Sequence, residues 1–298
     1  MNYRKKLREE KEMCNSIGII TDSNSGITSK EANEWGVTVI PMPFYINGEL
    51  YYEGLTLNQK EFYKFLEDNL DVNTSQPSPG DVMKTWDEVL KEKEYIIYIP
   101  MSSSLSGTYE TAVMLAEEYE GKVFVVNNRR ISVTQLQSVK DAINLVKKGK
   151  SAKEIKEILE DRQYQASIYI VPDTLDYLKK GGRLTPAVAS FAKVLNIKPV
   201  LQIQGEKLDA FKKVRGMKQA KRAMKEAIAD DIKNRFASNS NMRIYAAYTG
   251  SEEVGIEWKG ELEEAFPNYD IQIYPLSLSV SCHIGQGAIG IACVEELL

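Results

Sequence analysis

The sequence predicts an α/β protein with two domains. The N-terminal domain has a parallel sheet between helices (α/β/α), and the C-terminal α/β domain has a mixed sheet. The chain has 298 residues, about the length of two ordinary domains. In its first half, short apolar segments alternate with helical patterns, as they do in parallel sheets. After residue 166, a predicted hairpin joins the crossover connections. We therefore expect a polar N-terminal extension at 1–16, a first domain at 17–165 and a second domain at 166–298.

In the first domain, apolar segments predict strands, and the segments between them predict helices. The predicted strands are 17–21, 37–41, 95–100 and 122–126, and the predicted helices include 28–35, 57–70 and 132–148. Two further helices begin at Pro79 and near Tyr109. Thr28 and Glu31 form a capping-box pattern, and proline suits a first helical turn.

The second domain mixes hairpins with crossovers. Apolar segments predict six strands, at 166–171, 198–204, 207–211, 242–248, 269–275 and 288–294. Helical patterns cover 174–180, 217–236 and 258–266, and another helix begins at Pro186. Gly205 and Glu206 separate two of the strands, which predicts a hairpin turn.

Composition excludes several classes of protein. With 38 Lys+Arg against 42 Asp+Glu, the net charge is -4, so the chain lacks the basic field of nonspecific nucleic-acid binders. One histidine and three cysteines without C-x-x-C spacing predict no metal site. We find no apolar run of about 20 residues, so we expect no integral membrane association. Sparse cysteines and the absence of a signal peptide predict a cytoplasmic protein.

Two hydroxyl-rich loops are candidate anion sites. The first, Ser102–Thr108, has five hydroxyls in seven residues and stands between a predicted strand and a helix. Hydroxyls and the free amides of a helix N-terminus both bind carboxylate or phosphate. The second loop, Thr74–Ser78, has the same position before a helix. Simple helix capping also explains each loop, but both fall at the carboxyl ends of predicted parallel strands, where ligands of α/β proteins bind.

The only histidine, His283, begins a third candidate, the glycine-rich segment 283–290. The segment contains G-x-G-x-x-G, but too few residues follow it for a dinucleotide fold. Its glycines suit close approach of backbone to a ligand. A lone histidine can be structural or functional, and the sequence leaves both open.

A fourth candidate is Arg183, which follows Gly181 and Gly182 at a predicted helix end. Its guanidinium suits a phosphate or a partner's carboxylate. The segment 207–235 has ten Lys/Arg and four Asp/Glu, which is either a solvated face or a docking surface. Gly149-Lys150-Ser151 is not a P-loop, because Asn144 replaces the required glycine. We therefore expect no ATP-dependent chemistry from this chain alone.

Several segments, in order along nearly the whole chain, resemble those of the DegV family of bacterial fatty-acid-binding proteins. They are 19–23, 74–78, 103–109, 174–178, 181–183, Lys198-Pro199 and His283 with its glycines. The resemblance implies a two-domain fold that encloses one long-chain fatty acid. It also implies no catalysis by this chain and no cofactor. A separate ATP-binding kinase subunit would convert the bound acid to an acyl phosphate.

By the same resemblance, residues of the two hydroxyl loops would bind the fatty-acid carboxyl together with His283. The residues in question are Thr74, Ser75, Ser104, Ser106, Gly107 and Thr108. Gly285, Gly287 and Ala288 would allow the ligand to approach, and Arg183 would contact the partner or the phosphoryl group.

The chain departs from the family pattern in two places. Residues 127–135 lack the family's glycines and carry two arginines instead, and Gln286 replaces a usual proline. These changes affect the predicted pocket wall and therefore the preferred acyl chain.

The competing hypothesis is a serine hydrolase that acts on an acyl substrate through Ser106 and His283. Such an enzyme needs a nucleophile, a base and an orienting acid. The residue types exist in the sequence, but no G-x-S-x-G elbow does.

Overall fold

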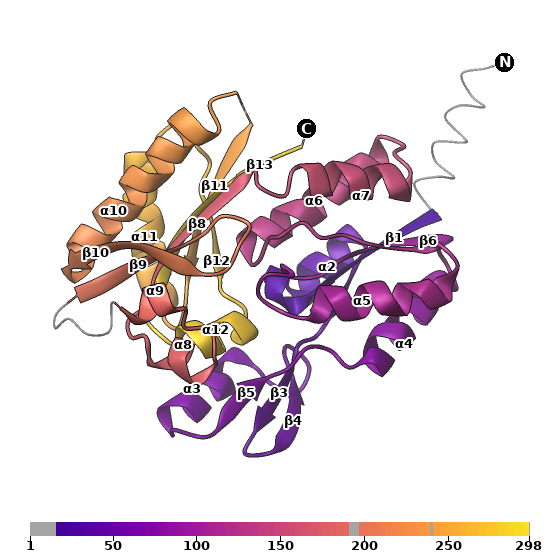
Figure 1. Ribbon diagram of the computed structural model, residues 1–298, viewed down its shortest axis with the longest axis horizontal. Coiled ribbons are helices and arrows are strands. Elements are labelled where there is room, and N and C mark those ends of the chain that lie inside the picture. Colours follow the sequence, from indigo (N-terminus) through magenta and orange to yellow (C-terminus); the bar gives the residue numbers. More distant parts are fainter. Residues whose placement is uncertain (1–15, 191–196, 239–240, 298) are drawn as a thin grey trace.

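The computed structural model describes residues 16–190, 197–238 and 241–297. The N-terminal domain contains a parallel sheet with the strand order β2-β1-β6-β7 (Figure 1). Its strands are β1 (Ile17–Asp22), β2 (Val37–Ile40), β6 (Tyr95–Ile99) and β7 (Val123–Val125). Each of the four predicted strands is present, and all three pairings are parallel.

Helices cover both faces of this sheet. They are α2 (Ser29–Trp35), α4 (Pro79–Leu90), α5 (Thr108–Ala116), α6 (Val133–Lys147) and α7 (Ala152–Asp161). Alternate residues of a strand point to opposite faces: Ile20 and Tyr98 pack toward α4 and α5, whereas Ile19 and Ile97 pack toward α2, α6 and α7. The predicted α/β/α arrangement is therefore confirmed.

A small antiparallel sheet, which the sequence analysis did not predict, extends from this domain. It has the order β4-β3-β5, with β3 (Pro43–Ile46), β4 (Glu49–Tyr52) and β5 (Val72–Thr74), and it packs on α3 (Gln59–Glu67). Asn47 and Gly48 connect β3 to β4, and both have positive φ, 50° and 87°. Asn-Gly is a strong hairpin signal, so the sequence did contain the information.

The C-terminal domain is a six-stranded mixed sheet of order β10-β9-β8-β13-β11-β12. Its strands are β8 (Ala166–Val171), β9 (Ile197–Ile203), β10 (Asp209–Arg215), β11 (Met242–Tyr248), β12 (Gln272–Pro275) and β13 (Ile289–Glu295). Only the β11–β12 pair is parallel among these strands of the described chain. The predicted mixed sheet and the β9–β10 hairpin are confirmed.

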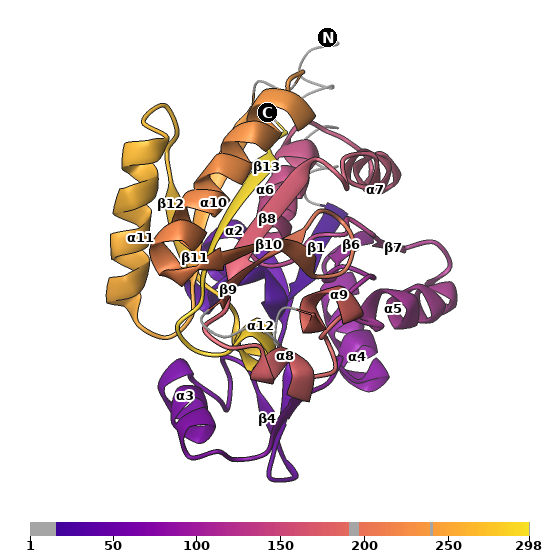
Figure 2. The ribbon, with the colours of Figure 1, turned by 60° about the vertical axis from the view of Figure 1, so that its left-hand side comes forward.

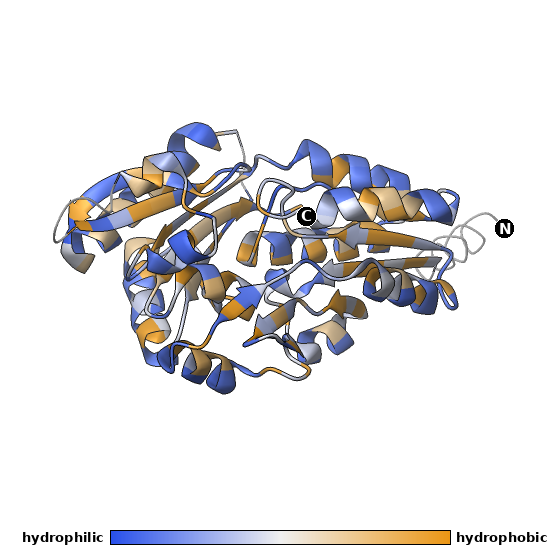
Figure 3. Ribbon diagram, turned by 60° about the horizontal axis from the view of Figure 1, so that its bottom comes forward, coloured by the Kyte–Doolittle hydropathy of each residue, from blue (hydrophilic) through white to orange (hydrophobic). Residues whose placement is uncertain are grey.

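The two faces of the mixed sheet are covered differently. Helices α10 (Gly216–Asp230), which continues as a π-helix (Asp231–Arg235), and α11 (Glu252–Ala265) pack on one face. The short helices α8 (Asp176–Lys180), α9 (Pro186–Ala189) and α12 (Leu278–Ile284) lie on the other. Hydrophobic segments (orange in Figure 3) concentrate on the strands and on the helix faces turned toward them.

Two contacts join the domains. Helix α6 packs on β1 of the parallel sheet and on β13 of the mixed sheet, so one apolar core runs through both (Figure 2). Helix α12 lies against the small sheet, where Leu278 and Cys282 pack with Phe44 and Phe62. The domains therefore contact each other at two places, through α6 and through α12.

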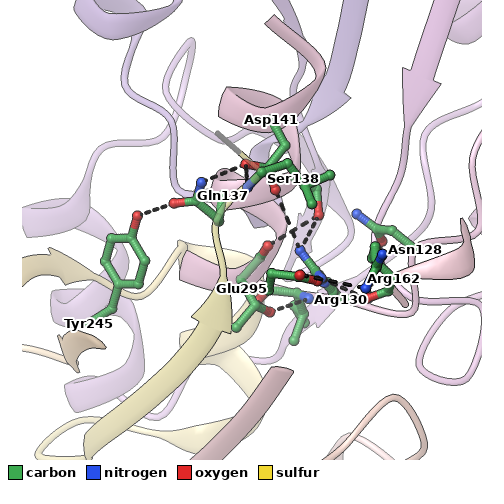
Figure 4. Close-up of polar contacts among 11 residues, drawn as sticks. Asn128, Arg130, Gln137, Ser138, Asp141, Arg162, Tyr245 and Glu295 are labelled. Carbon is green, nitrogen blue, oxygen red and sulfur yellow. Dashed lines mark hydrogen bonds and ion pairs between the residues drawn. The ribbon is translucent and has the colours of Figure 1, made fainter. Parts of the chain in front are cut away.

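A buried polar network adds to the first contact (Figure 4). The Arg130 guanidinium, 3% exposed, donates to Ser138 Oγ at 3.0 Å and to the Arg162 carbonyl at 2.7 Å, and it lies 4.0 Å from Asp141. Burial raises the pKa of Asp141 to about 6, although the Arg130 charge acts in the opposite direction. Asp141 also accepts a hydrogen bond from the Leu297 amide, so the network links α6 to the segment after β13.

The neighbouring arginine makes a more exposed connection. Arg129 pairs with Glu206 in the β9–β10 turn at 2.7 Å, and its guanidinium lies 5.6 Å from the centre of the Tyr164 ring. The departure from the family pattern at 127–135 thus places two arginines at the domain interface.

These two arginines should differ strongly in their contribution to stability. Arg130→Ala leaves Asp141 buried without its cation, so we expect the free energy of unfolding to fall by about 3–5 kcal/mol. Arg129→Ala breaks a pair whose glutamate is 66% exposed, and should cost at most about 1 kcal/mol. Urea denaturation followed by tryptophan fluorescence measures both. Equal losses in the two variants would contradict the structural role assigned to the Arg130 network.

Candidate functional site

A cavity lies between the two domains. Its walls come from the inner face of the mixed sheet, through Ile168, Ile170 and Ala247, and from loops of the N-terminal domain, through Met42 and Met101. One region of the lining is polar and contains Thr74, Ser75, Gln76, Ser106, Arg183 and His283. We call this region the polar end of the interdomain cavity.

Thr74 and His283 meet in this polar end. Thr74 is the last residue of β5, and His283 lies in the last turn of α12. Their side chains are joined by a hydrogen bond of 2.9 Å between Thr74 Oγ1 and His283 Nε2. The packing of α12 on the small sheet therefore brings together two predicted residues that are 209 positions apart.

The imidazole of His283 is held in its neutral form. Burial, together with the Arg183 charge, lowers the pKa of His283 to about 4. Its Nδ1 is buried and has no hydrogen-bond partner among the described residues. The ring lies directly over Gly181, where an added Cβ would approach Nδ1 to 2.1 Å. Glycine is thus required at 181 for the histidine to occupy this position.

The Ser102–Thr108 loop contributes one hydroxyl to the cavity. Ser106 lines it, and its Oγ lies 2.8 Å from Thr108 Oγ1. Thr108 itself is buried and does not line the cavity, nor does Gly107, which precedes the first turn of α5. Ser104 lies outside, with its Oγ 3.5 Å from the Gly205 carbonyl and from Glu206.

In the glycine-rich segment, His283, Ile284 and Gly290 line the cavity, whereas Gly285, Gly287 and Ala288 do not. Gly285 has φ 81°, and an added Cβ would lie 2.4 Å from the Tyr177 ring. Gly287 also has positive φ, and the Ala288 amide donates to Thr249 Oγ1 at 2.9 Å. These contacts end α12 at Ile284, with Gly285 as its C-cap, and fix the position of His283.

Arg183 occupies the rim. Its side chain is exposed, borders the cavity, and donates to the Gly181 carbonyl at 2.7 Å. Ser75 is also exposed at this border. The structure thus brings Thr74, Ser75, Ser106, Arg183 and His283 to one end of the cavity.

The sequence analysis missed three buried polar residues in the lining: Asn24, Ser132 and Ser279. Asn24, 1% exposed, follows β1, and Ser279 lies in the first turn of α12; the Ser279 hydroxyl donates to Asn24 Oδ1. Asn24 Nδ2 in turn donates to Asp22 at 2.9 Å. The polar cluster at 22–25, directly after a predicted parallel strand, was the available signal.

Glu53 holds the start of α12. Its carboxylate accepts hydrogen bonds from the Leu278 amide at 2.5 Å and from the Ser23 hydroxyl at 2.6 Å. Negative charge is favourable at a helix N-terminus, yet burial raises the pKa of Glu53 to about 7. Both ends of the helix that carries His283 are therefore fixed by contacts outside it.

Within the described ranges, no group of three or more His, Cys, Asp or Glu side chains could hold a metal ion. None of the helices in that part of the chain is long and apolar enough to cross a membrane.

The protonation of His283 gives a direct test of this geometry. Because the chain has one histidine, NMR titration of untagged protein reports a single imidazole, and we expect a pKa near 4. The unfolded chain then binds more protons than the folded chain between about pH 4 and 6.5. The contribution of His283 to the free energy of unfolding should therefore decrease as pH falls through that window.

Arg183→Ala is the matched variant for this titration. Burial and the Arg183 charge both lower the pKa of His283, and burial has the larger effect. The variant removes only the charge, so the pKa should rise but stay below its ordinary value. A wild-type pKa at or above about 6.5 would show that the imidazole is solvated.

Comparison with known proteins identifies the family. A model of the DegV family, described as uncharacterised protein, matches residues 16–296. A DegV domain-containing protein of Deinococcus radiodurans is 30% identical over 279 residues, which is 93% of this chain and 98% of that protein. One from Staphylococcus aureus strain N315 is 29% identical over 280 residues, with coverage of 93% and 98%.

Solved structures of DegV family proteins have the same fold as this chain. A DegV family protein of Thermus thermophilus, described with fatty acid binding, superposes with a TM-score of 0.86 at 26% identity, covering 94% of this chain and 99% of that one. DegV of Bacillus subtilis, described as a fatty acid binding protein, gives 0.83 at 26% identity with the same coverage. A family protein of Ruminococcus gnavus described with vaccenic acid gives 0.81 at 27% identity, covering 93% and 99%. From the match of sequence and of both domains over almost its whole length, this chain belongs to the DegV family.

Proposed function

We propose that this chain is a cytoplasmic, non-enzymatic carrier that binds one long-chain fatty acid in the interdomain cavity. It would present the carboxyl group to a separate ATP-dependent kinase subunit for acyl-phosphate formation. The observation that carries the proposal is the cavity itself, with apolar walls and one polar end. Each CH₂ of an acyl chain buried there contributes about 0.8 kcal/mol. Relatives of the same fold are described as fatty-acid-binding proteins, which supports this ligand.

The polar end suits a carboxylate. A buried carboxylate needs donors, and the hydroxyls of Thr74 and Ser106 lie there. If the neutral His283 donates from Nε2 to Thr74 Oγ1, the threonine proton is free to point at the ligand. This tautomer also leaves Nδ1 without a hydrogen, which suits its unpartnered position over Gly181. His283 would then act as a positioning residue for Thr74.

The rim of the cavity suits contact with a kinase subunit that phosphorylates the bound acid. Arg183 is exposed beside the polar end, where a guanidinium can reach a phosphoryl group or a carboxylate of the kinase subunit. The sequence has no nucleotide-phosphate loop of its own, so ATP would come with the partner. A closed cavity would also protect an acyl phosphate from water.

The geometry does not favour the serine hydrolase. The Ser106 hydroxyl is hydrogen-bonded to Thr108, and His283 is hydrogen-bonded to Thr74. A triad needs the base on the nucleophile and an acid on the base, and no described carboxylate hydrogen-bonds to His283. Labelling of Ser106 by a fluorophosphonate probe would reverse this conclusion.

The ligand can be tested by extraction. We expect organic extracts of the native protein to contain close to one fatty acid per chain, by mass spectrometry. Thr74→Val and Ser106→Ala should each weaken palmitate binding about tenfold to a hundredfold, because each removes a hydrogen bond to a charged group. Thr38→Val, in β2 and outside the cavity lining, is the control. Absence of lipid together with no binding of added oleate or palmitate would refute the carrier function.

The variant Arg183→Ala tests whether this arginine acts in phosphorylation by the kinase subunit. An exposed arginine adds little to stability, so we expect an unchanged melting temperature. The variant should slow acyl-phosphate formation, with a kinase subunit active on the wild-type complex, far more than it weakens palmitate binding. Wild-type turnover at saturating carrier would rule out the contact with partner or phosphoryl group. A lowered melting temperature would instead indicate a structural role.

A further inference from the structure

Ser132 brings an unpaired hydroxyl to the interdomain cavity. The residue lines the cavity and is only 6% exposed. It is the N-cap residue of α6, yet its side chain makes no capping hydrogen bond, and no other partner of its hydroxyl is found among the described residues. A buried hydroxyl without a partner costs free energy. A polar group of a ligand inside the cavity would supply the missing partner.

The backbone beside Ser132 offers further donors. The amides of Val133 and Thr134 are the first two of a helix of 15 residues and have no intrahelical acceptor. No other acceptor for them is found in the described part of the chain. Val133 also lines the cavity. The hydroxyl of one residue and the amide of the next can therefore bind the same oxygen atom.

The backbone of Ser132 itself is held in a rarely used conformation. Its φ is 55° and its ψ is -135°, a region that glycine adopts far more readily than other residues. The Ser132 amide donates to the Asn24 carbonyl at 3.0 Å, which fixes the residue from outside the helix. Strain of this kind is typical of ligand sites, where the surrounding structure imposes it.

This group of donors lies along the acyl part of the cavity. Val133 packs in the apolar cluster that Ile168 borders. Ile170, by contrast, packs in the cluster that contains Ile284, the neighbour of His283. Ile168 and Ile170 both line the cavity and are about 7 Å apart along β8. A group bound at the start of α6 is therefore several carbon atoms away from a carboxyl bound at the polar end.

The charges favour a neutral group over a second carboxylate. Arg183 lies at the polar end, and no other Lys or Arg among the described residues lines the cavity. Beside Ser132, Asn24 donates to the fully buried Asp22, which also accepts from the Gln135 side chain. A carboxylate at the start of α6 would have an acid nearby and no cation. An alcohol carries no charge and can both accept and donate a hydrogen bond.

We propose that Ser132 and the N-terminus of α6 form a hydroxyl subsite, which selects fatty acids that bear a hydroxyl group in the middle of the chain. The inference rests on the proposed function and deepens it by naming the class of acyl chain. The Val133 amide donates to the alcohol oxygen, and Ser132 Oγ accepts the alcohol proton. Thr74 and Ser106 hold the carboxyl as before.

Calorimetry on the full chain freed of lipid compares stearate with 10-hydroxystearate and 12-hydroxystearate. We expect wild type to bind at least one of the hydroxy acids as tightly as stearate, because a buried hydroxyl without partners would weaken binding about tenfold or more. Ser132→Ala should lower the affinity for that hydroxy acid about tenfold relative to stearate. Ser132→Gly removes the same hydroxyl and accepts the same φ, so it should show the same loss even if the alanine variant does not fold.

Two serine variants serve as controls. Ser106→Ala, at the polar end, should weaken both kinds of acid by the same factor and leave their ratio unchanged. Ser167→Ala removes a buried hydroxyl of β8 outside the cavity lining and should change neither affinity.

The hydroxyl subsite would be overturned if both hydroxy acids bound wild type tenfold more weakly than stearate. It would also be overturned if Ser132→Ala weakened stearate as much as the hydroxy acid, because the carboxyl would then lie at α6. Failure of wild type to bind stearate at all would instead remove the proposed function, a result that neither of these outcomes resembles.

Discussion

The cavity depends on one contact, the packing of α12 on the small antiparallel sheet. This helix belongs to the C-terminal domain by sequence, but its apolar face packs among Phe44 and Phe62 of the N-terminal domain. Glu53 fixes its first turn, and the close approach of Gly181 to the imidazole fixes its last. Because β5 is part of the same small sheet, the packing that positions His283 also positions Thr74.

The second constraint is that polar groups between the domains must find partners. Asp22, Asn24 and Ser279 hydrogen-bond in a chain beside the cavity, and Arg130 and Asp141 form a buried ion pair of 4.0 Å deeper along α6. Unpaired polar groups in such places cost several kcal/mol. These networks therefore specify one relative position of the domains, and the shape of the cavity depends on that position.

The sequence predicted the larger sheets because their strands are apolar and recur at regular intervals between helical patterns. It missed the small sheet, whose strands are as short as β2 and β7 but mix polar residues such as Glu49 and Asn73 with the apolar ones. It also missed α12, whose serines conceal its apolar face. Helix α7 went unrecognised although Ser151 and Glu154 form a capping box, so here a usable signal was present.

For the site, motif resemblance selected residues that the fold places together, such as Thr74 and His283. It could not separate Ser106, which lines the cavity, from Ser104, which faces the β9–β10 turn. That distinction depends on how two domains dock, and no local pattern encodes it. The pairing of Arg130 with Asp141 is likewise a tertiary effect between segments that read as ordinary helix and loop.

The place of β13 in the mixed sheet has a consequence for biosynthesis. This strand, residues 289–295, lies between β8 and β11, so the sheet stays in two separate pieces until those residues have been made. Contacts of such long range form slowly and leave strand edges exposed meanwhile. During translation, the N-terminal domain can complete its parallel sheet early, whereas the interdomain cavity can close only after residues 289–295 have been made. A nascent chain that still lacks those residues is thus expected to have the parallel sheet but no enclosed cavity.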